Sequence, residues 1–248
     1  MPTIAVGGER FDCDLVIFDM DGTLVDEVTR FRSLATARAR ALRELVGEDA
    51  VALWSRASGV DVDAGEIDMD GPLARAPRRE DLAVATTALY LSGYRWREAK
   101  RLAEQAYKMA DEIQTSTYDV SLLPGVEDTL RHMRGTGLRL AIATNGGCVG
   151  AVEIMRGIGV YELFDAIVGA DDVKNAKPAP DMVLLACERC GCRPSEAVYV
   201  GDQPEDMMAG RRAAVKAVIA VRSRFVPAAE IEGLSDAVIN SVGDIHAS

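Results

Sequence analysis

The sequence predicts an α/β fold, a doubly wound parallel sheet interrupted by an all-helical insertion. Short, continuous apolar runs recur along the chain, which is typical of strands buried on both faces of a parallel sheet. Stretches with helical spacing of apolar residues separate these runs, as in right-handed βαβ units. One interval, 27–118, contains helical stretches alone and is too long for an ordinary crossover.

The expected core strands are bounded by polar residues and turn signals. In chain order they are Leu15–Phe18, Leu138–Ala143, Ala166–Val168, Ala197–Val200, Ala217–Val221 and a weaker run, Ala237–Ile239. The helices expected between them are Val126–Arg134, Val149–Ile158, Pro180–Cys190 and Asp206–Ala214. A hairpin is expected ahead of the first core strand, where Thr3–Val6 runs into Gly7 and Gly8.

The interval 27–118 is interpreted as a separate helical domain. Helical spacing is found around 28–46, 79–92 and 95–113. The chain leaves the first strand shortly before this interval and returns to the strand pattern after it. The predicted domains are therefore an α/β core of 1–26 and 119–248 and a helical domain of 27–118.

Composition excludes several classes of protein. The chain has 248 residues, 48% of them apolar, and a net charge of −11, so it is neither disordered nor a membrane protein. Its acidity argues against a nucleic-acid partner, because phosphate backbones are bound by clustered Lys and Arg. No signal peptide and no spanning apolar run are found, so we expect a cytoplasmic protein without a membrane partner.

The negative charge is unevenly distributed. The interval 27–118 has 14 basic and 15 acidic residues, whereas the rest of the chain has 14 basic and 24 acidic residues. A phosphate-binding protein this acidic needs a local positive group or a metal at its site. The five cysteines are expected to be reduced thiols. Cys187, Cys190 and Cys192 form a CxxCxC group, for which small apolar packing is favoured over a zinc site because Cys13 and Cys148 are distant in sequence.

Polar side chains follow four of the predicted strands, where ligands of open α/β sheets bind. They are Asp19 and Asp21, Thr144 and Asn145, Lys177, and Asp202 and Asp206. Gathered carboxylates repel one another unless a cation neutralises them, and a hard oxygen site suits Mg²⁺. With Mg²⁺ as cofactor, Asp19 is expected to attack phosphorus and Asp21 to act as acid and base. Thr144, Asn145 and Lys177 are expected to hold the transferring oxygens.

These segments resemble, in order, the four motifs of the haloacid dehalogenase superfamily. The matching segments are DMDGTLVD (19–26), ATN (143–145), KPAPD (177–181) and GDQPED (201–206). The resemblance is to members with a helical C1-type cap inserted after the first motif, including phosphoglycolate-phosphatase-like enzymes, and it implies a Rossmann-like core. Gln203 and Pro204 depart from the Ser or Thr and small residue of many relatives, and Ala214 stands where Gly is common.

The resemblance also implies residue roles. Asp19 would be the nucleophile and Asp21 the acid/base, with Thr23 orienting Asp21. Asp19, the main-chain carbonyl of Asp21 and Asp202 would ligate Mg²⁺. Asp206 would support the metal through water or through Lys177.

Each motif has a simpler interpretation, as a turn, a helix cap or a solvated charge, and only their combination favours catalysis. The near repeat at 68–73 lacks a preceding strand and is interpreted as a solvated loop. His132 and His246 are the only histidines, so the sequence offers few candidates for the histidine of a Ser-His-Asp or Cys-His catalytic site.

The predicted function is hydrolysis of a small organic phosphate monoester through an aspartyl-phosphate intermediate. Asp21 favours a phosphatase over a dehalogenase, since an alkoxide leaving group benefits from an acid. Two alternatives stay open: a sugar-phosphate mutase similar to β-phosphoglucomutase, and a non-enzymatic protein that binds phosphate ligands. The expected partner is a small phosphorylated metabolite, bound by a monomer or homodimer. Arginines of 27–118 are candidates for its recognition: Arg30, Arg32, Arg78 and Arg79.

Overall fold

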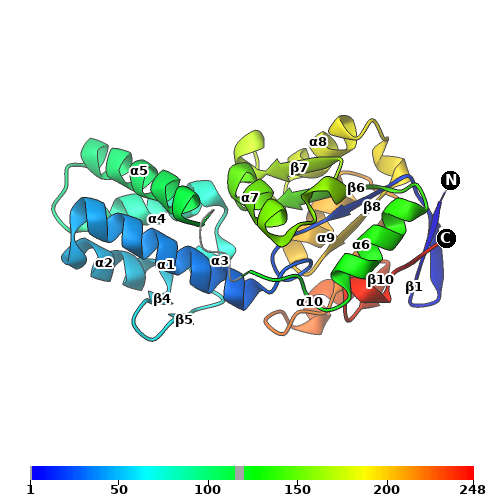
Figure 1. The fold of residues 1–248 in the computed structure, drawn as a ribbon, viewed down its shortest axis with the longest axis horizontal. Helices are drawn as coiled ribbons and strands as arrows, with labels where there is room; N and C mark the ends of the chain where they lie inside the picture. The colour runs from blue at the N-terminus through cyan, green and yellow to red at the C-terminus, as the bar shows by residue number, and fades with distance from the viewer. Residues whose placement is uncertain (1, 115–119) are drawn as a thin grey trace. The chain divides into compact units, whose positions relative to one another are not determined.

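The structure, a computed structural model, describes residues 2–114 and 120–248 and divides the chain into two compact units (Figure 1). One unit consists of Met1–Asp26 and Ser121–Ser248, and the other of Glu27–Val120. The sequence places the return to the core between residues 118 and 119, a point that lies outside the described residues. Over the described residues, no helix has the length and apolar character needed to cross a membrane.

A six-stranded parallel sheet forms the centre of the first unit, which confirms the predicted fold class. Its strand order is β10-β9-β8-β3-β6-β7. The strands are β3 (Leu15–Phe18), β6 (Arg139–Thr144), β7 (Ala166–Gly169), β8 (Ala197–Gly201), β9 (Ala217–Val221) and β10 (Ala237–Ile239). From β3 the chain continues to β6 and β7 on one side of the sheet. It then returns to form β8, β9 and β10 on the other side, so the direction in which strands are added reverses beside β3.

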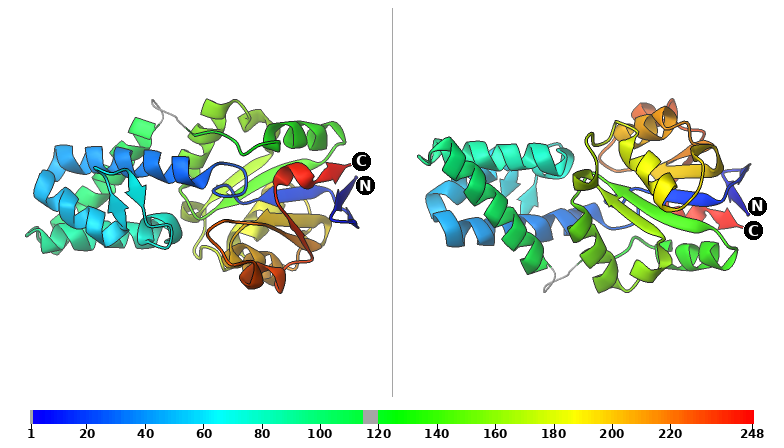
Figure 2. Two further views of the ribbon diagram at one scale, coloured as in Figure 1. Left: turned by 90° about the horizontal axis from the view of Figure 1, so that it is seen from below. Right: turned by 90° about the horizontal axis from the view of Figure 1, so that it is seen from above.

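Helices cover both faces of this sheet (Figure 2). On one face lie α6 (Val126–Gly135) and α7 (Cys148–Ile158), and on the other lie α8 (Asp181–Arg189) and α9 (Pro204–Arg212). α8 packs on β6 and β7, and α9 packs on β8 and β9. The remaining helical elements are α10 (Ala228–Glu232) and the 3₁₀ turns Tyr161–Leu163, Ala170–Asp172, Pro194–Glu196 and Val242–Asp244.

A small antiparallel sheet joins the two ends of the chain. The predicted hairpin is present as β1 (Thr3–Val6) and β2 (Glu9–Asp12), and β11 (His246–Ala247) pairs with the other edge of β1. Gly7 and Gly8 turn the hairpin with φ angles of 58° and 95°, a region that L-residues with side chains rarely adopt.

The second unit has its own apolar core, built from helices rich in alanine. Its helices are α1 (Glu27–Val46), α2 (Glu48–Ser58), α3 (Pro72–Arg75), α4 (Arg78–Leu91) and α5 (Trp96–Gln114). Trp54, Leu42 and Leu89 are fully buried in this core. The unit also contains a short antiparallel pair, β4 (Val60–Asp61) and β5 (Glu66–Ile67), just before the near repeat at 68–73.

A buried polar network ties four helices of this unit together. Arg38 of α1 forms an ion pair with Asp81 of α4, and its guanidinium lies 4.1 Å from the ring centre of Tyr107 of α5. The Tyr107 hydroxyl donates to Asp81 Oδ1 at 3.0 Å, and Trp54 Nε1 lies 3.4 Å from that hydroxyl. Buried charges are tolerated when they are paired in this way.

Candidate active site

The sheet topology brings the predicted catalytic residues to one edge. Asp19 follows β3, Thr144 is the last residue of β6, and Asp202 follows β8. Because β6 and β8 are the two neighbours of β3 and all three strands are parallel, their carboxyl ends meet at the same place. Lys177, in the segment before α8, reaches the same edge.

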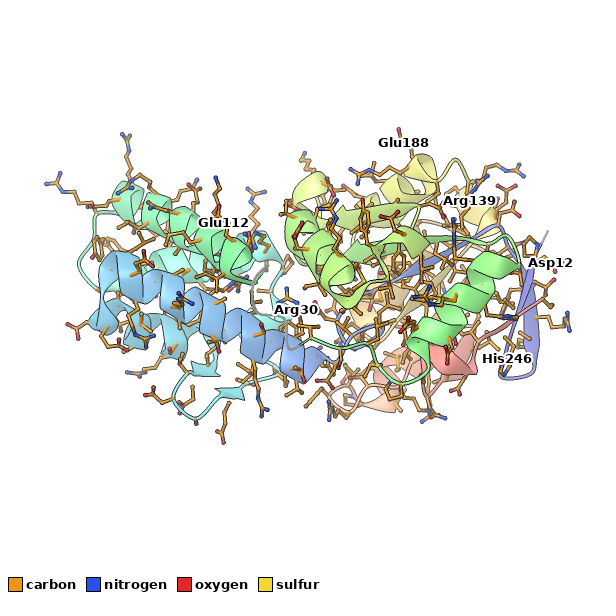
Figure 3. All side chains as sticks on the ribbon, viewed as in Figure 1. Asp12, Arg30, Glu112, Arg139, Glu188 and His246 are labelled. Carbon is orange, nitrogen blue, oxygen red and sulfur yellow. The ribbon has the colours of Figure 1, made fainter. Side chains whose placement is uncertain are left out.

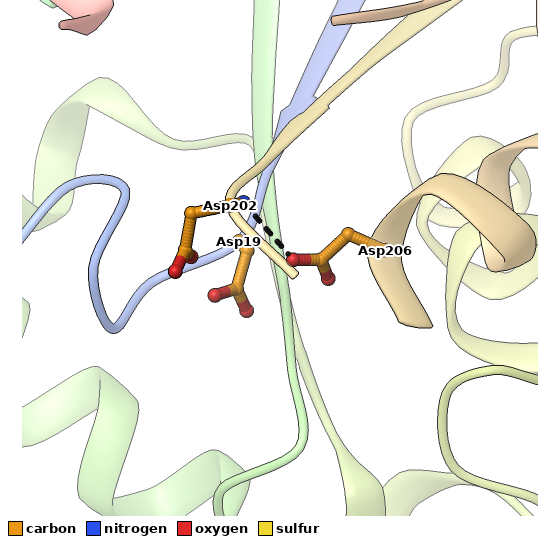
Figure 4. A group of neighbouring side chains, drawn as sticks. All are labelled: Asp19, Asp202 and Asp206. Carbon is orange, nitrogen blue, oxygen red and sulfur yellow. Dashed lines mark hydrogen bonds between the residues drawn. The ribbon is translucent and has the colours of Figure 1, made fainter. Parts of the chain in front are cut away.

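Three carboxylates converge there. Oxygen atoms of Asp19, Asp202 and Asp206 lie within 4.8 Å of one another. Figure 4 shows their side chains turned toward a common centre from β3, β8 and α9. Their exposed fractions are only 6%, 0% and 1%. Such burial of like charges is costly without a cation.

Lys177 supplies a cation to this group. Its Nζ donates to Oδ1 of Asp19 and to Oδ1 of Asp206, both at 2.6 Å, and to the carbonyl oxygen of Ala143 at 3.0 Å. Burial lowers the pKa of Lys177, but the carboxylates of Asp19 and Asp206 outweigh this effect and hold the pKa well above its usual value. Lys177 therefore stays protonated in the folded protein.

The environment of Asp19 makes ionisation of its carboxyl harder than for an aspartate in water. Burial raises the pKa of Asp19 to about 7, against the lowering effect of Lys177, and the charges of Asp206 and Asp21 add to the rise. Asp21 itself is half-buried in the turn after β3, where Gly22 has a φ of 80°.

Asp206 is held by the first turn of α9. Its Oδ2 accepts from the backbone amides of Asp202 at 3.2 Å and Gln203 at 3.0 Å, while its Oδ1 contacts Lys177. Gly201 is required next to it, because a Cβ at this position would lie 2.5 Å from Asp206 Cγ. The Gly-Asp pair at 201–202 is thus a packing requirement of the site.

Thr23 and Gln203 both donate to Asp202. The hydroxyl of Thr23 lies 3.0 Å from Asp202 Oδ1, and the amide Nε2 of Gln203 donates to Oδ2. The resemblance implies that Thr23 orients Asp21; the bond that we observe orients Asp202. Gln203, a departure from the usual family pattern, is therefore a second donor to this carboxylate.

The loop after β6 supports Lys177. Asn145 Oδ1 accepts from the backbone amide of Lys177 at 3.0 Å, so that Asn145 fixes the segment carrying the lysine. The buried hydroxyl of Thr144 accepts from the amide of Gly146 at 3.1 Å. These two residues, which the sequence predicts to bind phosphate, lie at the same edge as Asp19.

Tyr199 belongs to the site but was not predicted. It is fully buried in β8, and its hydroxyl lies 3.2 Å from Lys177 Nζ and 3.1 Å from Asp206 Oδ1. Burial and the charge of Asp206 raise the pKa of Tyr199 well above its usual value, so the hydroxyl is a donor. The available signal was a tyrosine inside a continuous apolar strand, since a buried hydroxyl needs a partner.

Several other candidate residues have contacts within their own part of the structure. His132 Nε2 contacts the carbonyl oxygen of Ala247, next to the small sheet. In the helical unit, Arg78 forms an ion pair with Asp111 at 2.5 Å, and Arg32 Nε donates to the carbonyl of Gly65 at 2.9 Å. Arg78 and Arg32 therefore have structural contacts of their own.

Comparison with known proteins identifies the family. A family model described as haloacid dehalogenase-like hydrolase matches residues 13–214. The chain belongs to the haloacid dehalogenase-like hydrolases. Phosphoglycolate phosphatase of Escherichia coli K12 is 30% identical over 206 residues, covering 82% of this chain and 79% of the relative. A probable phosphatase, IndB, of Dickeya dadantii is 30% identical over 239 residues, covering 94% of both chains.

A solved structure shares the fold of this haloacid dehalogenase-like hydrolase. It is a predicted phosphoglycolate phosphatase from Haemophilus somnus, with a TM-score of 0.66 and 20% identity. The match covers 94% of this chain and 96% of that one. Together with the sequence relatives, which are phosphatases, the family indicates an enzyme that hydrolyses phosphoric monoesters.

Proposed function

We propose that this protein is a Mg²⁺-dependent phosphatase that hydrolyses a small organic phosphate monoester through an aspartyl-phosphate on Asp19. The observation that carries the proposal is the position of Lys177, 2.6 Å from both Asp19 and Asp206, beside Asp202 at the carboxyl ends of the strands. This arrangement combines a nucleophile, a fixed cation and further carboxylate oxygens at one point.

The donor set fits Mg²⁺. The converging atoms are carboxylate oxygens, the hard ligands that this ion prefers, and one lysine is insufficient to neutralise three buried aspartates. Asp19, the main-chain carbonyl of Asp21 and Asp202 would hold the ion. Asp206 would support it from outside, because Lys177 and two backbone amides already engage its oxygens. When bound, the ion supplies charge neutralisation for the phosphate oxygens.

Asp19 is the nucleophile in this proposal. Its oxygen would attack phosphorus and form the P–O bond of an acyl phosphate while the bond to the leaving alkoxide breaks. Lys177 is already positioned against Asp19 Oδ1, where its charge offsets that of the incoming phosphoryl group. Thr144, at the end of the adjacent strand, would donate its hydroxyl to a phosphoryl oxygen.

Asp21 would serve as acid and then base. In the first step it would give a proton to the leaving alkoxide, and in the second it would remove a proton from the water that hydrolyses the acyl phosphate. Asp21 is half-buried in the turn two residues beyond Asp19, and from there its carboxylate would reach the leaving oxygen.

The relatives support a proposal for the substrate class. Phosphoglycolate phosphatases among them favour a small phosphorylated carboxylic acid. We assign the role of cap, the part that selects the substrate, to the helical unit Glu27–Val120. Its Arg30 and Arg79 stay candidates for binding the substrate's second anionic group.

The test is phosphate release from a panel of phosphomonoesters, with Mg²⁺ and with a chelator. We expect release of phosphate from small phosphorylated acids in Mg²⁺, loss of this activity in the chelator, and loss in Asp19→Asn. Glu205→Gln, which changes a neighbouring carboxylate outside the acidic group, is the matched control. Isomerisation of a hexose 1-phosphate in preference to hydrolysis would instead support a mutase, and inactivity on the whole panel would refute catalysis.

A further inference from the structure

The C-terminal end of α8 carries three cysteines in a defined turn. Gly191 has a left-handed φ of 62° directly after the helix. The amide of Gly191 donates to the carbonyl of Glu188, and the amide of Cys192 donates to the carbonyl of Cys187, both at 3.0 Å. This pair of bonds is the Schellman motif, in which a left-handed residue closes the helix.

The turn places Cys187 and Cys192 side by side. Because the Cys192 amide nitrogen lies 3.0 Å from the Cys187 carbonyl oxygen, the two Cα atoms are at most about 7 Å apart. The side chains at these two positions of a Schellman motif commonly touch. Cys187 is buried in the apolar cluster beneath α8, and Cys192 packs against that cluster while staying partly exposed. The separation suits a disulfide.

Arg139 supplies a positive charge to Cys192. Its Nη1, extending from the first residue of β6, donates to Cys192 Sγ at 3.0 Å and to the carbonyl oxygen of Cys190 at 2.7 Å (Figure 3). A guanidinium in contact with sulfur stabilises the thiolate, the reactive form of cysteine. The contact with the Cys190 carbonyl also offsets the negative end of the α8 dipole, which would otherwise oppose a thiolate.

The other cysteines near α8 differ from Cys192 in burial or in the charges around them. Burial raises the pKa of Cys187 to about 12 and that of Cys190 to about 11. Cys148 is partly exposed, as Cys192 is, and lies beside Arg189, but burial and the nearby Asp172 carboxylate outweigh that cation and raise its pKa to about 11. Cys148 is therefore the natural internal comparison for Cys192.

The cysteine group does not form a ready metal site. Within residues 2–114 and 120–248, the group of three or more ligand atoms close enough to share an ion consists of Asp19, Asp202 and Asp206. The end of α8 instead carries a pair of thiols: Cys192 is partly exposed and contacts Arg139, and Cys187 is buried.

We propose that Cys192 and Cys187 form a peroxide-sensitive thiol pair. The Cys192 thiolate attacks a hydroperoxide: an S–O bond forms, the O–O bond breaks, sulfur loses two electrons, and the peroxide leaves as water or alcohol. The Cys187 thiol then attacks the Cys192 sulfenic acid: the S–S bond forms, the S–O bond breaks, and the hydroxide leaves as water with the Cys187 proton. The net reaction consumes one hydroperoxide per disulfide.

The pair lies away from the catalytic edge. The turn after α8 adjoins the amino ends of the strands, where Arg139 begins β6 and the amide of Asp14 donates to the carbonyl of Glu196. Asp19 and Asp202 lie at the opposite, carboxyl ends. Oxidation of these cysteines therefore does not depend on the proposed phosphatase activity.

The test is oxidation of the reduced, full-length chain with stoichiometric hydrogen peroxide, followed by alkylation and tryptic mass spectrometry. Cleavage after Arg189 separates Cys187 from Cys190 and Cys192. We expect a peptide pair linked through Cys187 that persists in Cys190→Ser and is lost in Cys192→Ser. In Cys187→Ser, dimedone should trap a sulfenic acid on Cys192. Cys148→Ser, the matched control, should behave like the wild type.

The role of Arg139 is tested by the rate of oxidation. Arg139→Gln should slow modification of Cys192 about fivefold, with recovery in Arg139→Lys, whereas Arg193→Gln removes a neighbouring charge and should change little. Circular dichroism establishes that each variant is folded. A Cys190–Cys192 or Cys13–Cys192 linkage, equal oxidation of Cys148 and Cys192, or no change in Arg139→Gln would overturn the proposal.

Discussion

Lys177 and Tyr199 show how much a single side chain contributes at the active site. Lys177 neutralises two buried carboxylates, whereas the Tyr199 hydroxyl adds one bond to groups that Lys177 already holds. Lys177→Met should therefore abolish turnover. It should also lower the free energy of unfolding by about 3–5 kcal/mol, because buried carboxylates would be left without their cation. Tyr199→Phe should lower the free energy of unfolding by about 1 kcal/mol. Denaturant titration and kcat of the two variants check this.

Steady-state kinetics give a second test of the role of Tyr199. Because its hydroxyl positions Lys177 without facing substrate directly in our account, Tyr199→Phe should lower kcat with little change in KM. A change confined to KM would contradict a positioning role.

The raised pKa of Asp19 makes a prediction for stability against pH. With a chelator present, the folded protein binds a proton on Asp19 up to about pH 7, whereas an ordinary aspartate releases it near the usual value of 3.8. The folded state thus holds more protons between these values, so Asp19 lowers stability as pH rises from about 4 to 7.

Asp19→Asn removes this dependence. Urea unfolding at pH 5 and pH 8 should show the variant gaining stability relative to the wild type as pH rises. A difference between variant and wild type that is the same at both pH values would contradict the raised pKa.

At the scale of elements, central strands such as β3 and β8 were predictable because each is a short apolar run that is buried on both faces. The strands β4, β5 and β11 were not predictable, because each has only two residues and so shows no periodic pattern. The catalytic aspartates were predictable from motif order at strand ends. The Thr23–Asp202 bond and the inward hydroxyl of Tyr199 depend on three-dimensional packing across strands, which the local sequence does not encode.

Two arginines on α1 provide a matched comparison of buried and exposed ion pairs. Arg38 pairs with buried Asp81, while Arg43 pairs with exposed Glu48. Arg38→Met should cost about 3–5 kcal/mol of unfolding free energy, because Asp81 is left charged in the apolar core of the helical unit. Arg43→Met should cost at most about 1 kcal/mol. Chemical denaturation monitored by Trp54 fluorescence distinguishes the two, and equal effects would contradict a structural role for the Arg38–Asp81 pair.

At the scale of the whole molecule, the charge distribution matches the proposed chemistry. The unit that holds Asp19 and Asp202 carries most of the net charge of −11, and the helical interval is close to neutral. We expect Mg²⁺ to stabilise the protein by about 2.7 kcal/mol at 100 times its Kd. This gain should vanish in Asp202→Asn and persist in Glu205→Gln, as measured by thermal unfolding with and without the ion. Equal stabilisation of both variants would place the ion elsewhere.

The most direct test of the central claim is to locate the phosphoryl group on the enzyme. The variant Asp21→Asn, incubated with a hydrolysed substrate and Mg²⁺ and then acid-quenched, should accumulate an acyl phosphate, because the base for the second step is missing. Borohydride reduction should convert residue 19, within the tryptic peptide Phe11–Arg30, to homoserine. Label on any other residue, or turnover that persists in Asp19→Asn, would contradict the account.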